Sequence, residues 1–497
     1  MMNIGFDNEK YLQMQSAHIR ERIAQFDNKL YLEFGGKLFD DFHASRVLPG
    51  FQPDSKMRML MQLSDQAEIV IVISAEDIEK NKVRGDLGIT YDVDVLRLMS
   101  IFEEHGLFVG SVVITKYSGQ QSASLFKKKL EKLGIKVYLH YPIEGYPSNI
   151  PHIVSDEGYG KNEFIETSRP LIVVTAPGPG SGKMAVCLSQ LYHEHKRGIC
   201  AGYAKFETFP IWNIPLKHPV NLAYEAATAD LNDVNMIDPY HLEAYGRMAV
   251  NYNRDIEVFP VLDAMFRRIS GSSPYKSPTD MGVNMAGNCI SDDEVVCRAS
   301  KDEIIRRYFS TMCDSRRGRG SPAAVEKLEL IMQTAGVTVD ERPVVGAALE
   351  KSKSVADPNH PEAVAIELPD GRIVTGKTSA LLGPAAAAVL NAIKAMCDIP
   401  KDVHLIAPST IEPIQQLKVE MLGNRNPRLH TDEVLIALSI SAASHEDAAL
   451  AMKQLPKLAE CQAHTSVMLS PVDIKKLKQL GIQFTMEAKY ENNKNYH

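Results

Sequence analysis

Leu171-Ile-Val-Val-Thr-Ala-Pro-Gly-Pro-Gly-Ser-Gly-Lys183 begins as an apolar run and ends as a glycine-rich turn. The apolar part predicts a short strand that is buried on both faces, as strands of a parallel sheet are. The residues that follow place Met184, Leu188 and Leu191 on one face and predict an amphipathic helix to about Lys196. A strand, a glycine-rich turn and a helix in this order indicate an α/β fold.

The first 215 residues repeat this alternation, so we expect residues 1–215 to form an α/β domain with a mainly parallel sheet. Residues 216–343 read mainly as helices, one of which follows Ser321, a residue type that caps helices, and ends at Gly336. Residues 344–497 are expected to form a smaller α/β domain. The other strands predicted in the first domain are Ile69–Ile73, Val109–Thr115 and Lys136–Leu139.

The third part opens with a hairpin signal. Pro369-Asp-Gly371 favours a tight turn between strands at Ala363–Leu368 and Arg372–Thr375. An alanine-rich helix from about Pro384 to Met396 follows. The remaining predicted elements are strands at Val403–Ala407 and Val434–Ser439, a helix at His445–Leu458, and a last helix and strand near Val472–Met486.

Composition excludes several classes of protein. The chain has 497 residues, of which 44% are hydrophobic and 24% charged, as is typical of a globular multidomain protein. No segment has the length and apolarity of a membrane span, and the N-terminus lacks the features of a signal peptide. Seven cysteines without a C-x-x-C pair indicate reduced thiols. We therefore predict a cytoplasmic protein with no membrane partner.

The glycine-rich turn is the strongest candidate for a binding site. It approaches the phosphate-binding pattern G-x-x-x-x-G-K-[ST], in which backbone N–H groups surround an anion and the lysine reaches a phosphate. Pro177 replaces the first glycine, and Met184 replaces the hydroxyl residue that holds Mg²⁺. A bound ATP or other nucleotide would therefore need another carboxylate for its Mg²⁺, or the anion carries no metal. The predicted phosphate-binding residues are Gly178, Gly180, Ser181, Gly182 and Lys183, and the alternative is a packing turn with a solvated lysine.

A second segment, Gly371-Arg-Ile-Val-Thr-Gly-Lys-Thr378, fits the same pattern in full. Its first glycine belongs to the predicted hairpin turn and a strand follows it, whereas a phosphate loop needs its strand before the first glycine. We therefore expect a structural role for this segment.

Ligands of open α/β sheets bind beyond the carboxyl ends of the strands, so charged residues in that region are candidates for a cleft. Each candidate also has a structural interpretation. Residues 80–88 could form a charged surface loop, residues 156–161 a turn, and the aromatic residues around Lys205 and Glu207 could pack against their neighbours. The candidate cleft residues are Arg84, Asp86, Lys161 and Lys205.

Signals for metal or nucleic-acid chemistry are weak. His193 and His195 project about 200° apart on a helix and lack the i, i+4 spacing of H-E-x-x-H, so we predict no metal site. Arg316-Arg-Gly-Arg319 is the only dense basic run in a chain of net charge −7, which disfavours nucleic acid as a partner.

Five unusual strings occur between residues 44 and 286. They are Ala44-Ser-Arg-Val-Leu-Pro-Gly-Phe51, Lys82-Val-Arg-Gly-Asp-Leu-Gly-Ile-Thr-Tyr-Asp92, Thr175-Ala-Pro-Gly-Pro-Gly-Ser-Gly-Lys-Met184, Tyr203-Ala-Lys-Phe-Glu-Thr-Phe-Pro-Ile-Trp212 and Asp280-Met-Gly-Val-Asn-Met-Ala286. Together they resemble a bacterial family of uncharacterised proteins. Some members of that family are labelled ATP-dependent zinc protease, which the missing H-E-x-x-H motif contradicts here. The resemblance therefore implies no activity.

Ala365-Ile-Glu-Leu-Pro-Asp-Gly-Arg-Ile-Val-Thr-Gly376 and the alanine-rich helix after it are similar to the start of the cytidine deaminase fold. In that family the helix carries a zinc ligand and a catalytic Glu, and a P-C-x-x-C motif after the next strand supplies further ligands. The corresponding stretches here are Ala385-Ala-Ala-Ala-Val389 and Pro408-Ser-Thr-Ile-Glu-Pro413, which lack them. The resemblance implies a deaminase-like topology without deaminase chemistry.

These patterns lead to one main hypothesis and one alternative. The chain binds a nucleotide or another small phosphorylated ligand at residues 178–183 and, if it is an enzyme, transfers a phosphoryl or nucleotidyl group. The alternative is a non-catalytic protein whose C-terminal domain serves ligand sensing or homo-oligomerisation, with which close-packing alanines at residues 385–388 are compatible.

Overall fold

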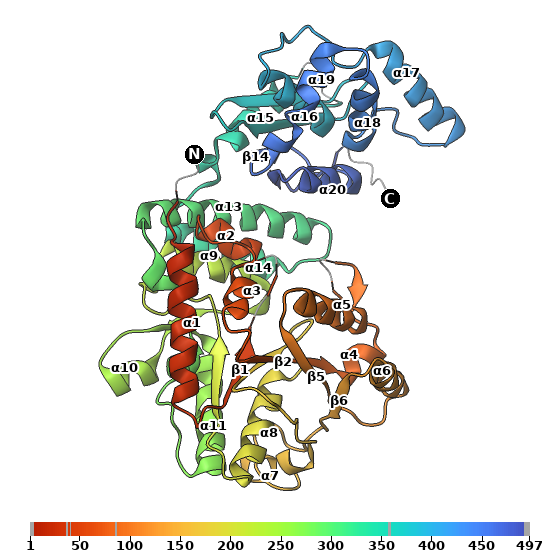
Figure 1. Ribbon diagram of the computed structural model, residues 1–497. Coiled ribbons are helices and arrows are strands. Elements are labelled where there is room, and N and C mark those ends of the chain that lie inside the picture. The colour runs from red at the N-terminus through yellow and green to blue at the C-terminus, as the bar shows by residue number, and fades with distance from the viewer. Residues whose placement is uncertain (1–3, 36–37, 40, 85–86, 356–358, 492–497) are drawn as a thin grey trace. The chain divides into compact units, whose positions relative to one another are not determined.

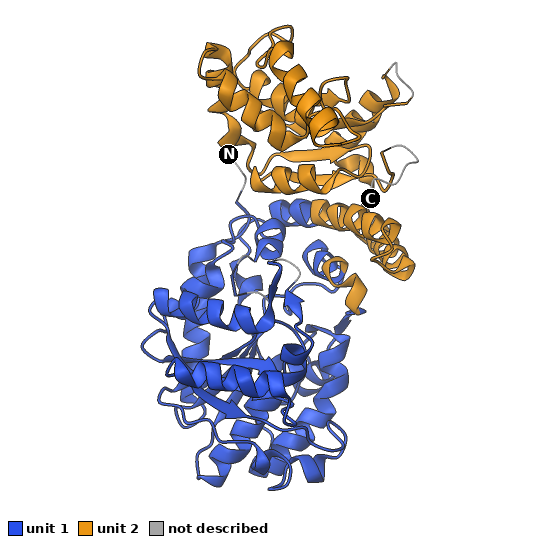
Figure 2. Ribbon diagram, turned by 90° about the vertical axis from the view of Figure 1, so that its right-hand side faces the viewer, with its two compact units in different colours: residues 1–225, 232–300 blue, residues 226–231, 301–497 orange. Residues whose placement is uncertain are grey.

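The computed structural model describes residues 4–35, 38–39, 41–84, 87–355 and 359–491. The chain forms two compact units, one of residues 1–225 and 232–300 and one of residues 226–231 and 301–497 (Figure 2). Many residues of the expected helical middle part therefore belong to the first unit. Among the described residues, none of the helices combines the length and the apolarity that a transmembrane span requires.

The first unit is built on a seven-stranded sheet in which all neighbouring strands run parallel (Figure 1). This confirms the α/β class, the parallel sheet and the four strands predicted in this region. In spatial order the strands are β11 (Gly282–Val283), β8 (Gly202–Phe206), β1 (Leu30–Phe34), β7 (Leu171–Thr175), β2 (Ala67–Ser74), β5 (Phe108–Thr115) and β6 (Lys136–Leu139).

Three of the seven strands, β1, β8 and β11, were not predicted, and burial explains both why the predicted sequences form strands and why β1 was missed. Every residue of β2 and β7 is buried, in agreement with their unbroken apolar runs. β1 contains Glu33, and a carboxylate is costly to bury unless it is hydrogen-bonded. The hydroxyl of Tyr203 on β8 donates a hydrogen bond to Glu33 Oε2 at 2.7 Å and so makes a charged residue acceptable in a central strand.

Helices and two short hairpins connect the strands of this unit. The hairpins are β3 (Val83–Arg84) with β4 (Ile89–Thr90) and β9 (Asn235–Ile237) with β10 (Val250–Tyr252). The helices are α1 (Asn8–Ala24), α2 (Phe42–Val47), α3 (Ser55–Met61), α4 (Ala75–Glu79), α5 (Tyr91–Glu104), α6 (Gln121–Lys132), α7 (Ile150–Ile153), α8 (Lys183–Lys196), α9 (Pro219–Ala227, which ends in the second unit), α10 (Pro239–Tyr245), α11 (Asn253–Ser270) and α12 (Pro278–Met281).

The second unit combines helices with a mixed four-stranded sheet. α13 (Asp293–Arg316) enters it from the first unit, and α14 (Pro322–Ala335) starts and stops as predicted: Ser321 Oγ accepts a hydrogen bond from the Ala323 N–H, and Gly336 ends the helix at φ 63°. In spatial order the strands are β13 (Ile373–Lys377), β12 (Ala363–Glu367), β14 (Gln462–Thr465) and β15 (Gln483–Met486). The other helices are α15 (Pro343–Lys353), α16 (Pro384–Ala395), α17 (Pro408–Gln416), α18 (Thr431–Ser441), α19 (Glu446–Met452) and α20 (Pro471–Gln479).

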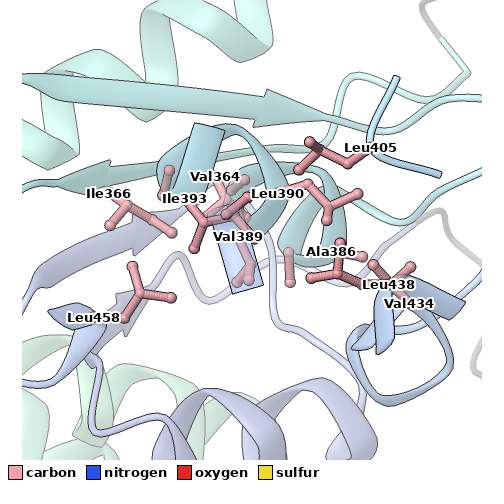
Figure 3. Close-up of a cluster of buried hydrophobic side chains, with 14 of the residues drawn as sticks. Val364, Ile366, Ala386, Val389, Leu390, Ile393, Leu405, Val434, Leu438 and Leu458 are labelled. Atoms are coloured by element: carbon pink, nitrogen blue, oxygen red, sulfur yellow. The ribbon is translucent and has the colours of Figure 1, made fainter. Parts of the chain in front are cut away.

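The core of the second unit forms where α16 packs on the hairpin β12–β13. Figure 3 shows Val364 and Ile366 of β12 in one cluster with Val389 and Ile393 of α16. Three of the close-packing alanines, Ala385, Ala386 and Ala388, have at most 1% of their surface exposed. These alanines therefore fill the core of their own unit and offer no surface for contact between copies of the chain.

The second glycine-rich string has the structural role that its context predicted. Gly371 forms the turn of the hairpin at φ 83°, and Gly376 lies within β13. A Cβ atom on Gly376 would lie 2.1 Å from the backbone nitrogen of Ala388, so glycine is needed for the close approach of α16.

Two strand predictions in the second unit are wrong. Val434–Ser439 lies within α18, where His430 and Glu433 form a capping box that starts a helix. A short apolar run suits a buried helix as well as a strand, and the cap decides between them. Val403–Ala407 forms no strand, and the predicted helix His445–Leu458 is α19 followed by a 3₁₀ turn at Leu455–Leu458.

Candidate functional site

The glycine-rich loop lies at the carboxyl end of β7, the central strand of the parallel sheet. β7 is paired with β1 on one side and β2 on the other, and α8 begins at Lys183 directly after the loop. The predicted order of strand, glycine-rich loop and helix is therefore confirmed. The carboxyl edge of an open parallel sheet is the usual place for ligands in α/β proteins.

Hydrogen bonds and left-handed glycines hold the loop in one conformation. Gly180 and Gly182 have φ values of 78° and 89°, which residues with a side chain rarely adopt. Ser181, between them, is 1% exposed and donates from Oγ to the carbonyl oxygen of Gly178 at 2.6 Å. Thr115, at the end of β5, donates from Oγ1 to the carbonyl oxygen of Ser181 at 2.6 Å. These bonds order the loop without using its N–H groups.

The N–H groups of residues 180–185 have no hydrogen-bond acceptor within the described part of the chain. The first amide to donate back into the start of α8 is that of Val186, which bonds the Gly182 carbonyl at 3.0 Å. No side chain caps the helix. Free amides and the positive end of a 14-residue helix together form a favourable environment for an anion.

Gly178 has a different role from the other glycines of the loop. A Cβ atom at this position would lie 2.2 Å from the hydroxyl oxygen of Tyr91, the first residue of α5, whereas a Cβ on Gly180 would meet nothing within 4 Å. Gly178 therefore allows the loop to pack on α5, and Gly180 allows a backbone conformation. The predicted phosphate-binding set contains both kinds of glycine.

Lys183 is the one cation of the predicted site for which no ion pair is found among the described residues. It is partly buried at the first turn of α8. Cys187 lies one helical turn after Lys183. Burial, and to a smaller extent the charge of Glu33, raises the pKa of its thiol, whereas the charge of Lys183 lowers this pKa. Lys183 and Glu33 thus shift the pKa of the same thiol in opposite directions.

Of the other candidate cleft residues, Arg84 and Lys161 form ion pairs with neighbouring carboxylates. Arg84 Nη1 is 2.9 Å from Oδ2 of Asp94, which is fully buried. Lys161 is 60% exposed and lies 2.7 Å from Glu157. Its 3₁₀ turn packs beside α8, where the side-chain amide of the next residue, Asn162, donates from Nδ2 to Ser189 Oγ. Asp86 lies outside the described residues.

Lys205 is the centre of a buried cluster of charges at the end of β8. Its Nζ lies 2.7 Å from Glu207 Oε1 and 2.6 Å from Asp255 Oδ2, and it also contacts the hydroxyl of Tyr252. Burial lowers the pKa of Lys205, but the two carboxylates outweigh burial and hold it well above its usual value. Burial and the Asp255 carboxylate raise the pKa of Glu207 to about 7, although Lys205 opposes this shift.

The sheet register relates this cluster to the glycine-rich loop. Glu33 on β1 is aligned with Lys205 on β8 and with Val174 on β7. Two strand spacings, about 10 Å, therefore separate the start of the cluster from the strand that carries the loop. Glu207 is 16% exposed and lines a small recess together with Trp212, Asn251 and Asn284. A titratable carboxyl group is thus accessible at the same edge of the sheet.

Comparison with known proteins places the sequence in a family. Residues 4–336 match the family described as "Domain of unknown function DUF1846, N-terminal", and residues 340–496 match its C-terminal counterpart. The chain belongs to the DUF1846 family. The resemblance to an uncharacterised bacterial family is therefore confirmed.

Relatives of this DUF1846 chain match over its full length. UPF0371 proteins of Streptococcus thermophilus and Streptococcus sanguinis are 58% identical to it, and one of Streptococcus pneumoniae is 57% identical, each over 496 residues that cover 100% of both chains. Their names state no activity. Any function of the DUF1846 chain must therefore be argued from its own residues.

The sequence of the DUF1846 chain indicated Lys205 and Glu207 as candidate residues, but it did not indicate Tyr252 and Asp255. The two missed residues follow Lys205 by about fifty positions and come from β10 and α11. A weak signal was present, because Asn251-Tyr-Asn-Arg-Asp255 places polar residues directly after a short apolar segment. Only the fold shows that this segment packs at the end of β8.

Proposed function

We propose that the chain binds a nucleotide or another phosphorylated small molecule at Gly180–Lys183. The observation that carries the proposal is the row of amide groups at residues 180–185 that lack acceptors in the described structure. Lys183 adds a positive charge at the first turn of α8. Amides of left-handed glycines and a helix N-terminus bind phosphate through several N–H donors at once.

Phosphoryl or nucleotidyl transfer is the reaction class that these groups favour. Amide donors and Lys183 would stabilise charge that develops on a phosphate oxygen in the transition state. Glu207, with a pKa of about 7, would exchange a proton with a second group of the substrate. Glu207 follows β8, and the loop follows β7, two strand spacings or about 10 Å away in the sheet, which suits a substrate of nucleotide size that lies along the sheet edge.

Metal-dependent anchoring at the loop is not expected. Met184 occupies the position from which a hydroxyl group normally holds Mg²⁺, and the hydroxyl groups of Ser181 and Thr115 bond loop carbonyls. We therefore expect Mg²⁺ to change the affinity for a nucleotide little.

Thermal unfolding of the full chain tests the proposal. ATP, GTP and pyrophosphate are compared with adenosine, which has no phosphate. A ligand that binds here stabilises the folded state by about 2.7 kcal/mol at 100 times its dissociation constant, and adenosine should not stabilise it through this loop. Lys183→Ala should lose most of the stabilisation, whereas Lys132→Ala, at the exposed end of α6, should retain it. Equal stabilisation of both variants would refute the proposal, and so would no response to any phosphate compound.

We also propose that residues 344–491 share the layered topology of the cytidine deaminase fold. Strand β12 runs antiparallel to both β13 and β14, and β14 runs parallel to β15. The next strand after α16 is β14, because Val403–Ala407 forms no strand. The stretch that corresponds to P-C-x-x-C is therefore Ser470-Pro-Val-Asp473 rather than Pro408–Pro413, and it also lacks cysteine. This topology supports no deaminase chemistry.

A further inference from the structure

Three side chains outside the glycine-rich loop have the composition of a metal site. His218, Asp293 and Cys297 bring an imidazole nitrogen, a carboxylate oxygen and a thiol sulfur within 4.8 Å of one another. Among the described residues this is the only such group of three or more potential ligands. Sequence patterns did not reveal it, since His218 precedes the other two residues by about 75 positions.

The backbone brings these residues together within the first unit. His218 directly precedes α9, and Asp293 and Cys297 stand four residues apart in the first turns of α13, on the same face of that helix. The side chain of His218 is 10% exposed and that of Asp293 is 68% exposed. The group is thus anchored on one side and open to water on the other.

The distances within the group fit the geometry of zinc. His218 Nε2 lies 3.0 Å from Asp293 Oδ1 and 3.5 Å from Cys297 Sγ, and Sγ lies 3.6 Å from Asp293 Oδ2. Around a tetrahedral Zn²⁺, with bonds of about 2.0–2.1 Å to nitrogen and oxygen and about 2.3 Å to sulfur, neighbouring ligand atoms are about 3.3–3.6 Å apart. The two distances to Asp293 involve its two different oxygens, so a zinc ion fits once the exposed Asp293 carboxylate turns to bring one oxygen close to both Nε2 and Sγ.

We propose that His218, Asp293 and Cys297 bind Zn²⁺, with water as the fourth ligand on the open side. A thiolate and an imidazole select zinc over the hard cations Mg²⁺ and Ca²⁺, which prefer oxygen ligands. Three protein ligands and one exchangeable position are typical of zinc sites that take part in chemistry, whereas structural sites are closed by four protein ligands.

Hydrogen bonds show which protons the metal must displace. The Val220 N–H donates to His218 Nδ1 at 3.2 Å, so the neutral ring carries its proton on Nε2, facing Asp293 and Cys297. When Zn²⁺ binds, the thiol releases its proton to solvent, and the ring proton is transferred from Nε2 to Nδ1. The ring then gives up the hydrogen bond from Val220. Because a metal-bound histidine normally donates from its other nitrogen to an acceptor, this site should bind zinc more weakly than one with such an acceptor.

Cobalt absorption tests the proposal on the full, untagged chain. Co²⁺ serves as a spectroscopic substitute for Zn²⁺ because a cobalt–thiolate bond gives a charge-transfer band and a tetrahedral centre gives intense d–d bands. We expect one Co²⁺ per chain and loss of both kinds of band when Zn²⁺ is added. Cys297→Ser should abolish the charge-transfer band, and His218→Asn should weaken binding by about tenfold or more.

Matched variants separate this site from adventitious binding. Cys200→Ser and His195→Asn alter an exposed cysteine and an exposed histidine of the same unit and should leave the cobalt spectrum unchanged. Asp293→Asn changes an exposed side chain, so it should fold normally and still bind Co²⁺ more weakly. The proposal is overturned if the native chain gives no charge-transfer band, if the band survives in Cys297→Ser, or if Cys200→Ser removes it.

Discussion

Glu207 should make the stability of the first unit depend on pH. In the unfolded chain this carboxyl group ionises near its usual pKa of 4.5, whereas burial and the neighbouring Asp255 raise its pKa in the folded chain to about 7. Between these two pH values the folded state holds more protons than the unfolded state, so the free energy of unfolding falls as the pH rises. At about 1.36 kcal/mol per pKa unit, the shift corresponds to a loss of about 3 kcal/mol across this window.

The variant Glu207→Gln isolates this effect because it keeps the shape of the side chain and removes its titration. Unfolding by urea is followed at several pH values between 4.5 and 8 through the fluorescence of Trp212, the only tryptophan of the chain. Trp212 lines the same recess as Glu207 and therefore reports on this unit. The stability of the native chain relative to Glu207→Gln should decrease by about 3 kcal/mol as the pH rises through the window.

Glu166→Gln is the control for this test. Glu166→Gln changes a carboxylate that is 73% exposed and paired with Lys136, and its stability relative to the native chain should not follow the same window. If the difference between the native chain and Glu207→Gln is constant from pH 4.5 to 8, or increases with pH, the raised pKa of Glu207 is wrong.

Two further predictions concern buried contacts. Thr115→Val removes the hydrogen-bond donor to the buried Ser181 carbonyl. The free energy of unfolding, measured in urea, should fall by about 1–3 kcal/mol, and phosphate compounds should bind more weakly in calorimetry. Unchanged stability and affinity would contradict the role given to this bond. Gly376→Ala places a Cβ 2.1 Å from the backbone of Ala388 and should lower the stability of the second unit by about 3 kcal/mol, as circular dichroism during denaturation will show. The matched variant Gly346→Ala, in α15 with no atom within 4 Å of the new Cβ, should instead stabilise by about 0.5–1 kcal/mol.

The sequence predicted the parts of the fold that depend on local apolar patterns. Strands β2, β5, β6 and β7 were recognised because each contains a run of apolar or β-branched residues. β1 was missed because the partner that satisfies Glu33, Tyr203, lies 170 residues further along the chain. The segment Val434–Ser439 was assigned to a strand because an apolar run alone does not distinguish a strand from a buried helix.

For the candidate site too, the sequence predicted local features but not contacts between distant residues. The conformation of the loop at Gly180–Gly182 follows from its glycines and its position between a strand and a helix, both of which are local. The surroundings of Lys205 do not, because Tyr252 and Asp255 reach it from distant elements. His218 and Cys297 likewise meet only through the fold. The residue types in the sequence indicated where a site could lie, but only the tertiary structure shows which side chains contact one another there.

The position of β7 in the sheet has a consequence for synthesis of the chain. β1 and β2 are made early, yet they are not neighbours, because β7 is inserted between them. A nascent chain that ends before residue 171 therefore cannot complete the centre of the sheet and exposes the edges of β1 and β2. Exposed strand edges favour association between chains. Emergence of residues 171–175 from the ribosome is thus the event that joins the two halves of the sheet, and truncation before this point should yield an aggregating fragment.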